Sequence, residues 1–339
     1  MGRTDFEARE PVAAARELLD TASGDPVYAL DQPVRTTTAV VRAAYEGGGP
    51  PLRIVAPREE LVTLRNRFPT AARAAALAAD DRLAVRAHEG AGLTPMFVTD
   101  EEVRVMLTVE DAAAVGGHDE GSFVEDAPNV AERAWENAES FDLRAPPLDR
   151  VTDAMTEAFG EAFRDDFETA LAAARWPVGS LPDTSDSSPP SPAAPGPWSP
   201  DPDAAGVEEA TSPTTDESES SRIEGELGGE SELGGEDGSG NRREPPTFDE
   251  VGVTLVLAAK HEELYYEVSR WGEDTGIASE ATFSRRKRRL EEADVLDTEK
   301  QPIDMGRPRQ RLVLGSAAAD RLTLDGIPGL VGLVADSTE

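Results

Sequence analysis

Five consecutive basic residues near the carboxyl end have the types and spacing to bind an anion. They occupy residues 285–289 (RRKRR), within a helix that the pattern predicts over residues 280–292, with Ser279 as its N-cap. If Phe283 is buried, Leu290 lies on the same face, because successive residues turn by about 100° along a helix. The opposite face then carries Ser284, Arg285, Arg288 and Arg289, with Thr282 on its flank.

These side chains suit the chemistry of a DNA duplex. Arginine can donate two hydrogen bonds to guanine, and serine or threonine can contact bases or phosphates. We therefore expect the helix to read the major groove of double-stranded DNA through Thr282, Ser284, Arg285 and Arg288, with Ser279 at its start. In the alternative, the five bases pair with Glu291 and Glu292 within the helix and have no partner outside it.

A second basic group follows on a predicted β-hairpin. Residues 295–301 and 307–314 form its strands, and residues 302–306 form its tip. We expect Arg289 to act together with the hairpin residues Lys300, Arg307 and Arg309, and to hold the DNA backbone or the adjacent minor groove.

Two more helices are predicted before the basic one, over residues 248–261 and 264–274. Two helices, a basic helix and a basic hairpin follow one another in a winged helix-turn-helix, where the third helix enters the major groove. A homodimer is expected, because two half-sites supply the affinity that one short helix lacks. A second alternative keeps this fold but uses it as a protein-interaction module.

The first half of the chain alternates helix and strand patterns, which predicts an α/β domain over residues 1–176. Helices are expected over residues 9–19, 35–45, 59–79, 129–139 and 148–174, and strands over residues 27–30, 52–56, 83–87, 95–99 and 103–109. The first strands should be parallel, and residues 95–109 should form an antiparallel hairpin. Such a domain could sense a small-molecule effector, mediate dimerisation or catalyse a reaction.

No catalytic, cofactor or metal residues can be assigned in this half. The glycines at 47–49 fit a turn between helix and strand, and residues 116–118 (GGH) read as a loop. His88, His118 and His261 lack metal-ligand spacing, and we expect them at surface or turn positions. Asp165 and Asp166 read as a solvated helix face. An enzyme with its catalysis in residues 1–176 remains the alternative.

The charge distribution separates a third region. The chain has 67 acidic and 33 basic residues, a net charge of −34, which at first argues against nucleic acid. Residues 281–311, however, carry nine bases and six acids. Residues 177–246 are rich in Pro, Gly, Ser and acids and predict a disordered linker, with a docking motif at Trp198 as the alternative.

Other features of the sequence indicate the cellular environment in which the protein is expected to function. The absence of cysteine excludes disulfides and thiolate metal sites, and only three of the 33 bases are lysines, as in halophiles with molar internal salt. The start of the chain lacks the apolar core of a signal peptide, and no apolar run is long enough for a membrane span. We expect a cytoplasmic protein without a membrane partner.

Four segments of the carboxyl-terminal half resemble the haloarchaeal TbsP family of transcriptional regulators: residues 271–279 (WGEDTGIAS), 281–285 (ATFSR), 297–300 (DTEK) and 302–309 (PIDMGRPR). Residues 52–64, 96–106 and 141–151 are similar more weakly. The resemblance implies an archaeal DNA-binding regulator, with metabolic genes as its expected targets. The expected domains are residues 1–176, the linker 177–246, the winged helix 247–315 and a tail over 316–339.

The first half also resembles phospholipase-D-like effector domains. The HxK motif of active phospholipases is missing, because Thr94, Pro95 and Met96 precede the strand where it would stand. This resemblance implies a non-catalytic domain that senses a ligand or dimerises.

Overall fold

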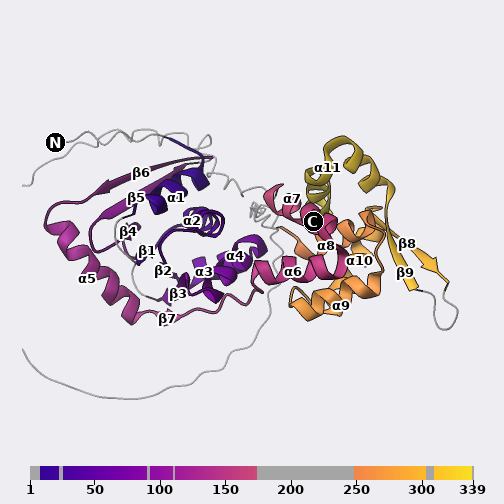
Figure 1. Cartoon of the computed structure of the whole chain (residues 1–339), viewed down its shortest axis with the longest axis horizontal. Helices are drawn as coiled ribbons and strands as arrows, with labels where there is room; N and C mark the ends of the chain where they lie inside the picture. Colours follow the sequence, from indigo (N-terminus) through magenta and orange to yellow (C-terminus); the bar gives the residue numbers. More distant parts are fainter. Residues whose placement is uncertain are drawn as a thin grey trace, which may run out of the picture. The chain divides into compact units, whose positions relative to one another are not determined.

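The computed structural model describes residues 8–22, 26–89, 92–109, 111–173, 248–302 and 309–337. The predicted linker with Trp198 lies outside these residues. So do Arg307 and most of the predicted hairpin tip. Figure 1 shows the order of the elements along the chain.

A seven-stranded mixed sheet organises the first half, in the order β6-β5-β4-β1-β2-β3-β7. The strands are β1 (Val27–Leu30), β2 (Leu52–Pro57), β3 (Leu83–His88), β4 (Met96–Val98), β5 (Val103–Val109), β6 (Ala112–His118) and β7 (Glu139–Ser140). The pairs β1–β2 and β2–β3 are parallel, and the other four pairs are antiparallel. The predicted α/β class, the parallel first half and the β4–β5 hairpin are therefore confirmed.

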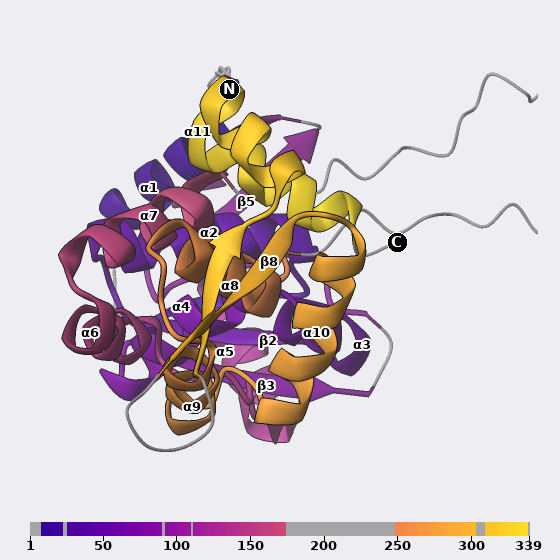
Figure 2. The ribbon, with the colours of Figure 1, turned by 90° about the vertical axis from the view of Figure 1, so that its right-hand side faces the viewer.

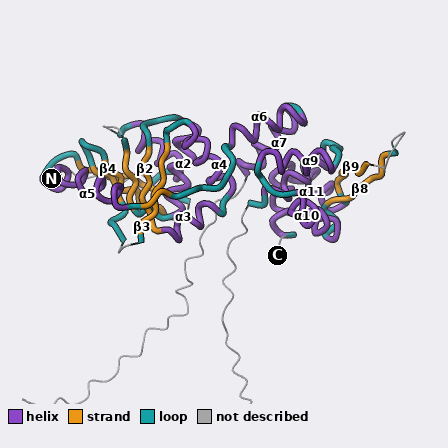
Figure 3. Tube along the Cα trace, turned by 90° about the horizontal axis from the view of Figure 1, so that it is seen from below, coloured by secondary structure: helices purple, strands orange, loops and turns teal. Residues whose placement is uncertain are grey.

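Helices cover both faces of this sheet (Figures 1 and 3). They are α1 (Pro11–Asp20), α2 (Val34–Gly47), α3 (Arg58–Arg65), α4 (Phe68–Ala79) and α5 (Ser122–Asn137). Alternate strand residues point to opposite faces. Accordingly, Ala29 joins the core under α1–α4, while its neighbour Leu30 joins the core under α5. The central strands β1, β2 and β4 are largely buried on both faces, which explains their nearly continuous apolar sequences.

Three predicted elements were wrong in extent. The helix over residues 59–79 is two helices, and Pro69 lies in the first turn of α4, where proline is tolerated. The helix over residues 148–174 breaks at Gly160 (φ 89°) into α6 (Leu148–Phe159) and α7 (Glu161–Ala173). Helix α5 begins at Ser122 and continues through Pro128, rather than starting after it.

The predicted loop at residues 116–118 is also wrong, because these residues end strand β6. Gly117 pairs with Arg104 of β5, and a Cβ at Gly117 would lie 3.0 Å from the Arg104 side chain. The glycine therefore permits a close approach between strands, and it does not break the strand. The glycines at 47–49 do form the expected turn, with positive φ at Gly48 and Gly49.

The second half forms three helices, a hairpin and a closing helix (Figure 2). They are α8 (Glu250–Lys260), α9 (Tyr265–Thr275), α10 (Glu280–Glu292), β8 (Leu296–Gln301), β9 (Arg309–Leu314) and α11 (Ser316–Asp336). Helix α8 is buried from Val251 to Ala259 and forms the centre of this half. Helix α11 packs on α7, α8 and β9, and it is kinked at Gly326 (φ 64°).

Two helices from before the linker share the core of the second half. Met155, Phe163 and Phe167 of α6 and α7 pack in one cluster with Leu255 and other residues of α8–α11. The domain division expected from the sequence stays a prediction. The packing nevertheless assigns α6 and α7 to the same hydrophobic core as the helices that follow the linker.

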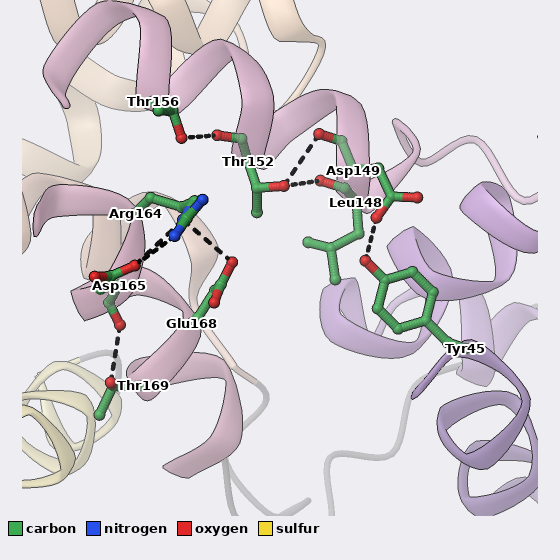
Figure 4. A network of polar contacts seen from close by, with 9 residues as sticks. All are labelled: Tyr45, Leu148, Asp149, Thr152, Thr156, Arg164, Asp165, Glu168 and Thr169. Carbon is green, nitrogen blue, oxygen red and sulfur yellow. Dashed lines mark hydrogen bonds and ion pairs between the residues drawn. The ribbon is translucent and has the colours of Figure 1, made fainter. Parts of the chain in front are cut away.

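Polar contacts accompany this packing (Figure 4). The Tyr45 hydroxyl of α2 donates to the Asp149 carboxylate at the start of α6. On α7, Asp165 pairs with Arg164 at 2.8 Å and is exposed, as predicted. Asp166 is different, because it contacts Lys260 and accepts a 2.6 Å contact from His261 Nε2, with 19% of its side chain exposed. The expectation of a solvated surface was wrong for Asp166.

Candidate nucleic-acid interface

The turn before α10 sets the direction of that helix. Helix α9 ends at Gly276 in the left-handed conformation (φ 81°), and the Ile277 N–H donates to the Gly272 carbonyl at 2.9 Å. A Cβ on Gly272 would lie 2.2 Å from the Phe283 ring, so α9 and α10 can approach this closely only with glycine there. Ser279 caps α10, its side chain accepting from the Thr282 N–H.

The predicted orientation of α10 is confirmed. Phe283 and Leu290 are fully buried, and Ser284, Arg285, Arg288 and Arg289 are exposed. Among the described residues, the Arg285 guanidinium makes only long contacts of 3.4–3.5 Å, to the Ala281 carbonyl and the Thr282 hydroxyl. Helix α10 therefore presents an outward row, which we define as Thr282, Ser284, Arg285, Arg288 and Arg289.

The other two bases of the run have structural roles. Arg286 is buried, forms an ion pair with Asp249 and donates from Nη2 to the Val334 carbonyl at 3.1 Å. Lys287 pairs with Glu291 at 2.7 Å and lies over the Tyr265 ring. These contacts tie α10 to α8, α9 and α11, which fixes the position of the outward row.

The alternative of internal pairing is correct for only part of the run. Lys287 pairs with Glu291, and Arg288 lies 3.6 Å from Glu292. The second pair is largely exposed, and such pairs contribute little because water and salt screen them. Within the described chain, neither Arg285 nor Arg289 forms an ion pair.

The hairpin supplies a second basic surface beside α9. Strands β8 and β9 pair antiparallel from Leu296–Leu314 to Gln301–Arg309. Lys300 is exposed and has no ion-pair partner among the described residues, whereas Arg309 lies 3.5 Å from Glu267. Arg311 is held by Glu262 and Glu299 at 2.9 and 2.7 Å. The hairpin is thus present as predicted, with acidic neighbours around its arginines.

Two partly buried ionisable groups lie on α8 and α9, the helices that pack against α10. Burial raises the pKa of Tyr265, and a hydrogen bond with Ser284 opposes this rise. Burial also raises the pKa of Glu250, at the start of α8, to about 7, and the neighbouring Asp249 charge adds to the rise. Ser284 is therefore exposed, and it also forms a hydrogen bond with the neutral side chain of Tyr265.

The sequence patterns did not predict one pair of exposed side chains on α9. Tyr266 and Arg270 stand one turn apart on its surface, 3.5 Å from hydroxyl to guanidinium. The helix before the recognition helix commonly crosses the DNA backbone, so these side chains are candidates for phosphate contacts. In the sequence, their spacing of four residues could have indicated this pair, because residues i and i+4 are neighbours on a helix surface.

The expected surface or turn positions are confirmed for two of the three histidines: His118 is exposed, and His261 lies in the turn after α8, where it contacts Asp166. The expectation was wrong for His88, which lies in β3, is partly buried and has Nε2 2.5 Å from the Asp31 carboxylate. In the described part of the chain, no cluster of three or more His, Asp or Glu residues could hold a metal ion. Among the described helices, none combines the length and apolar character needed to cross a bilayer.

An α/β domain followed by a helix-turn-helix with an exposed basic helix defines a DNA-binding regulator. Family models agree. The N-terminal domain of TbsP-like transcriptional regulators matches residues 6–146, and their C-terminal HTH domain matches residues 236–330. The chain therefore belongs to the TbsP-like transcriptional regulators.

Neither a curated protein nor a solved structure matches the chain. The family matches do not support the phospholipase-D-like resemblance of the first half.

Proposed function

We propose that this regulator binds double-stranded DNA with α10 in the major groove and controls metabolic genes in the cytoplasm. Thr282, Ser284, Arg285 and Arg288 contact base edges, and Arg289, Lys300, Arg307 and Arg309 contact the backbone or the minor groove. Ser279 acts first as the helix cap, from a position where it can also meet a phosphate. The observation that supports this proposal most directly is the solvent-facing position of the outward row of α10. Phe283 and Leu290, on the other side of the same helix, are buried.

The exposure of this row also favours DNA over the rival role as a protein-interaction module. A convex, solvated arginine surface fits a groove lined by phosphates. The acidic groups near Arg288 and Arg309 lower the net attraction, so specificity rests on base contacts and DNA shape. In molar salt, counterion release contributes little further affinity.

The proposal includes a homodimer and a sensory N-terminal domain. One apolar strip is available for a second copy: Val105, Leu107 and Val109 point to the same side of β5 and are 37, 54 and 66% exposed. No charge stands in this strip, so two chains of net charge −34 can meet there with the least repulsion. Sedimentation of Leu107→Asp tests it, and a monomer is expected.

DNA binding can be tested with operator-sized duplexes selected from genomic fragments, at high KCl. Arg285→Ala with Arg288→Ala should weaken binding at least about 30-fold, because each bidentate base contact contributes about 1–3 kcal/mol. The matched control, Arg133→Ala with Arg150→Ala, removes the same charge from exposed sites in the first half. Equal affinity of both double variants would show that α10 is not the recognition helix.

A further inference from the structure

Two arginines on neighbouring strands converge on Trp135 of α5. The guanidinium carbon of Arg86 lies 4.4 Å from the Trp135 ring centroid, and that of Arg53 lies 5.4 Å from it. Arg53 on β2 is in register with Ala84 on β3, two residues before Arg86, so both arginines stand on the α5 side of the sheet. All three residues of this cluster are partly buried.

Each guanidinium uses only part of its donor capacity. Arg53 Nη1 donates to the Tyr28 hydroxyl at 2.6 Å, and Arg86 Nη1 donates to the Trp135 carbonyl at 2.7 Å. A guanidinium has five N–H donors and cannot accept. Toward the described residues, Nε and Nη2 of both arginines make no hydrogen bond, and neither arginine has a carboxylate within 4.0 Å.

Some arginines of the same sheet domain have a carboxylate partner: Arg42, Arg58 and Arg104 each meet one at 2.7–2.8 Å. Others, such as Arg73 and Arg82, resemble the cluster, because among the described residues they donate to backbone carbonyls and form no ion pair. The hydrogen bond from Arg86 to the Trp135 carbonyl can be explained as a cap on the carboxyl end of α5. A cap does not explain the position of Arg53. Both guanidinium carbons lie within 5.4 Å of the Trp135 ring centroid, and an anion that accepts from their unused N–H groups would offset both positive charges.

Two members of the cluster, Arg86 and Trp135, line one part of a surface groove with a volume of about 570 Å³, and Arg53 is not part of its wall. Ser140 and Asp142 also line the groove, and Leu83 and Leu143 provide apolar wall. The volume falls in the range of small-ligand sites. Planar guanidinium groups favour bidentate binding of carboxylate or phosphate oxygens. Ser140 and Asp142 can accept hydrogen bonds from hydroxyls on the rest of a ligand.

We propose that Arg53, Arg86 and Trp135 form the binding site of a small organic anion, whose carboxylate or phosphate group accepts hydrogen bonds from the unused donors of the two guanidinium groups. The inference rests on the proposed sensory role, and it names the chemical class of the effector. Anion binding is measured without DNA, so its failure and the failure of DNA binding are separate results.

The test is a fluorescence titration of the full chain with inorganic phosphate and, separately, with succinate, at constant ionic strength. Trp135 lies in the site, so we expect a saturable change with one of these anions and its loss in Trp135→Phe. Arg53→Gln with Arg86→Gln should weaken binding at least about tenfold. The control Arg65→Gln with Arg133→Gln should bind normally. Its Arg65 also lies over an aromatic ring, at 5.6 Å from Phe141.

The two titrations identify the class of anion, and the arginine variants test the location of the site. Saturation by phosphate alone indicates a phosphorylated ligand, and saturation by succinate alone indicates a carboxylate. Arg53→Gln by itself leaves the α5 contact of Arg86 in place, and it should still weaken binding about threefold or more. No saturable change with either anion in the unaltered chain overturns the proposal. Unchanged affinity in Arg53→Gln does the same, whether or not the double variant folds.

Discussion

The arginines of α10 and those beside Trp135 are the same residue type in opposite settings. Arg285 and Arg289 stand on a convex surface with no fixed carboxylate, free to adjust to a groove. Arg53 and Arg86 are stacked on an aromatic ring and held by one hydrogen bond each. Exposed, adaptable cations suit a long polyanion. Fixed, partly desolvated cations suit a small anion of defined shape.

Helix α10 contains the same contrast within one turn, because Arg286 is buried beside the exposed Arg285. Arg286→Ala leaves the Asp249 carboxylate buried without its cation, and we expect a loss of about 3–5 kcal/mol in the free energy of unfolding. Arg289→Ala, on the outward side, should change it by less than about 0.5 kcal/mol. Urea unfolding measures both, and equal effects would contradict the division of α10 into two sides.

Glu250, the residue after Asp249, gives the second largest expected effect on the free energy of unfolding. Burial raises the pKa of Glu250 to about 7 from an ordinary value of 4.5, so the folded chain keeps a proton that the unfolded chain releases. The free energy of unfolding should therefore fall by roughly 3 kcal/mol as the pH rises from 4.5 to 7. Glu250→Gln should remove this dependence. An unchanged slope in Glu250→Gln would locate the titrating group elsewhere.

The approach of α9 to α10 predicts a smaller effect. Gly272→Ala places a methyl group against the Phe283 ring, and we expect a loss of about 1–3 kcal/mol with a weakened DNA affinity. Gly332→Ala is the control, since nothing lies within 4 Å of a Cβ there. A stable Gly272→Ala that binds DNA normally would mean that the outward row tolerates another helix angle.

The smallest effect concerns the exposed Arg288–Glu292 pair. Glu292→Gln should change the free energy of unfolding by less than about 0.5 kcal/mol. It should also raise DNA affinity about twofold at low salt, because a carboxylate near the phosphates is removed. Glu168→Gln, which removes a similarly exposed partner of Arg164 on α7, should leave DNA affinity unchanged. A drop in affinity with Glu292→Gln would show that the pair orients Arg288.

Local patterns predicted the carboxyl-terminal module well. The bounds of α10, its Ser279 cap and its buried Phe283 and Leu290 follow from periodicity, because helix phase is set by the chain itself. The same reasoning failed at Gly117 and Asp166. A glycine in a paired strand and a carboxylate beside Lys260 are indistinguishable from a loop and a wet surface until distant residues are known.

The sequence by itself determined most of the element types, the α/β class and the basic helix with its exposed side, since these depend mainly on neighbours along the chain. Only the tertiary structure decided which arginines of the run are structural, because the partners of Arg286 are Asp249 and Val334. It also brought Arg53, Arg86 and Trp135 together from two strands and a helix. Contacts between residues distant in sequence depend on packing, and no local period encodes them.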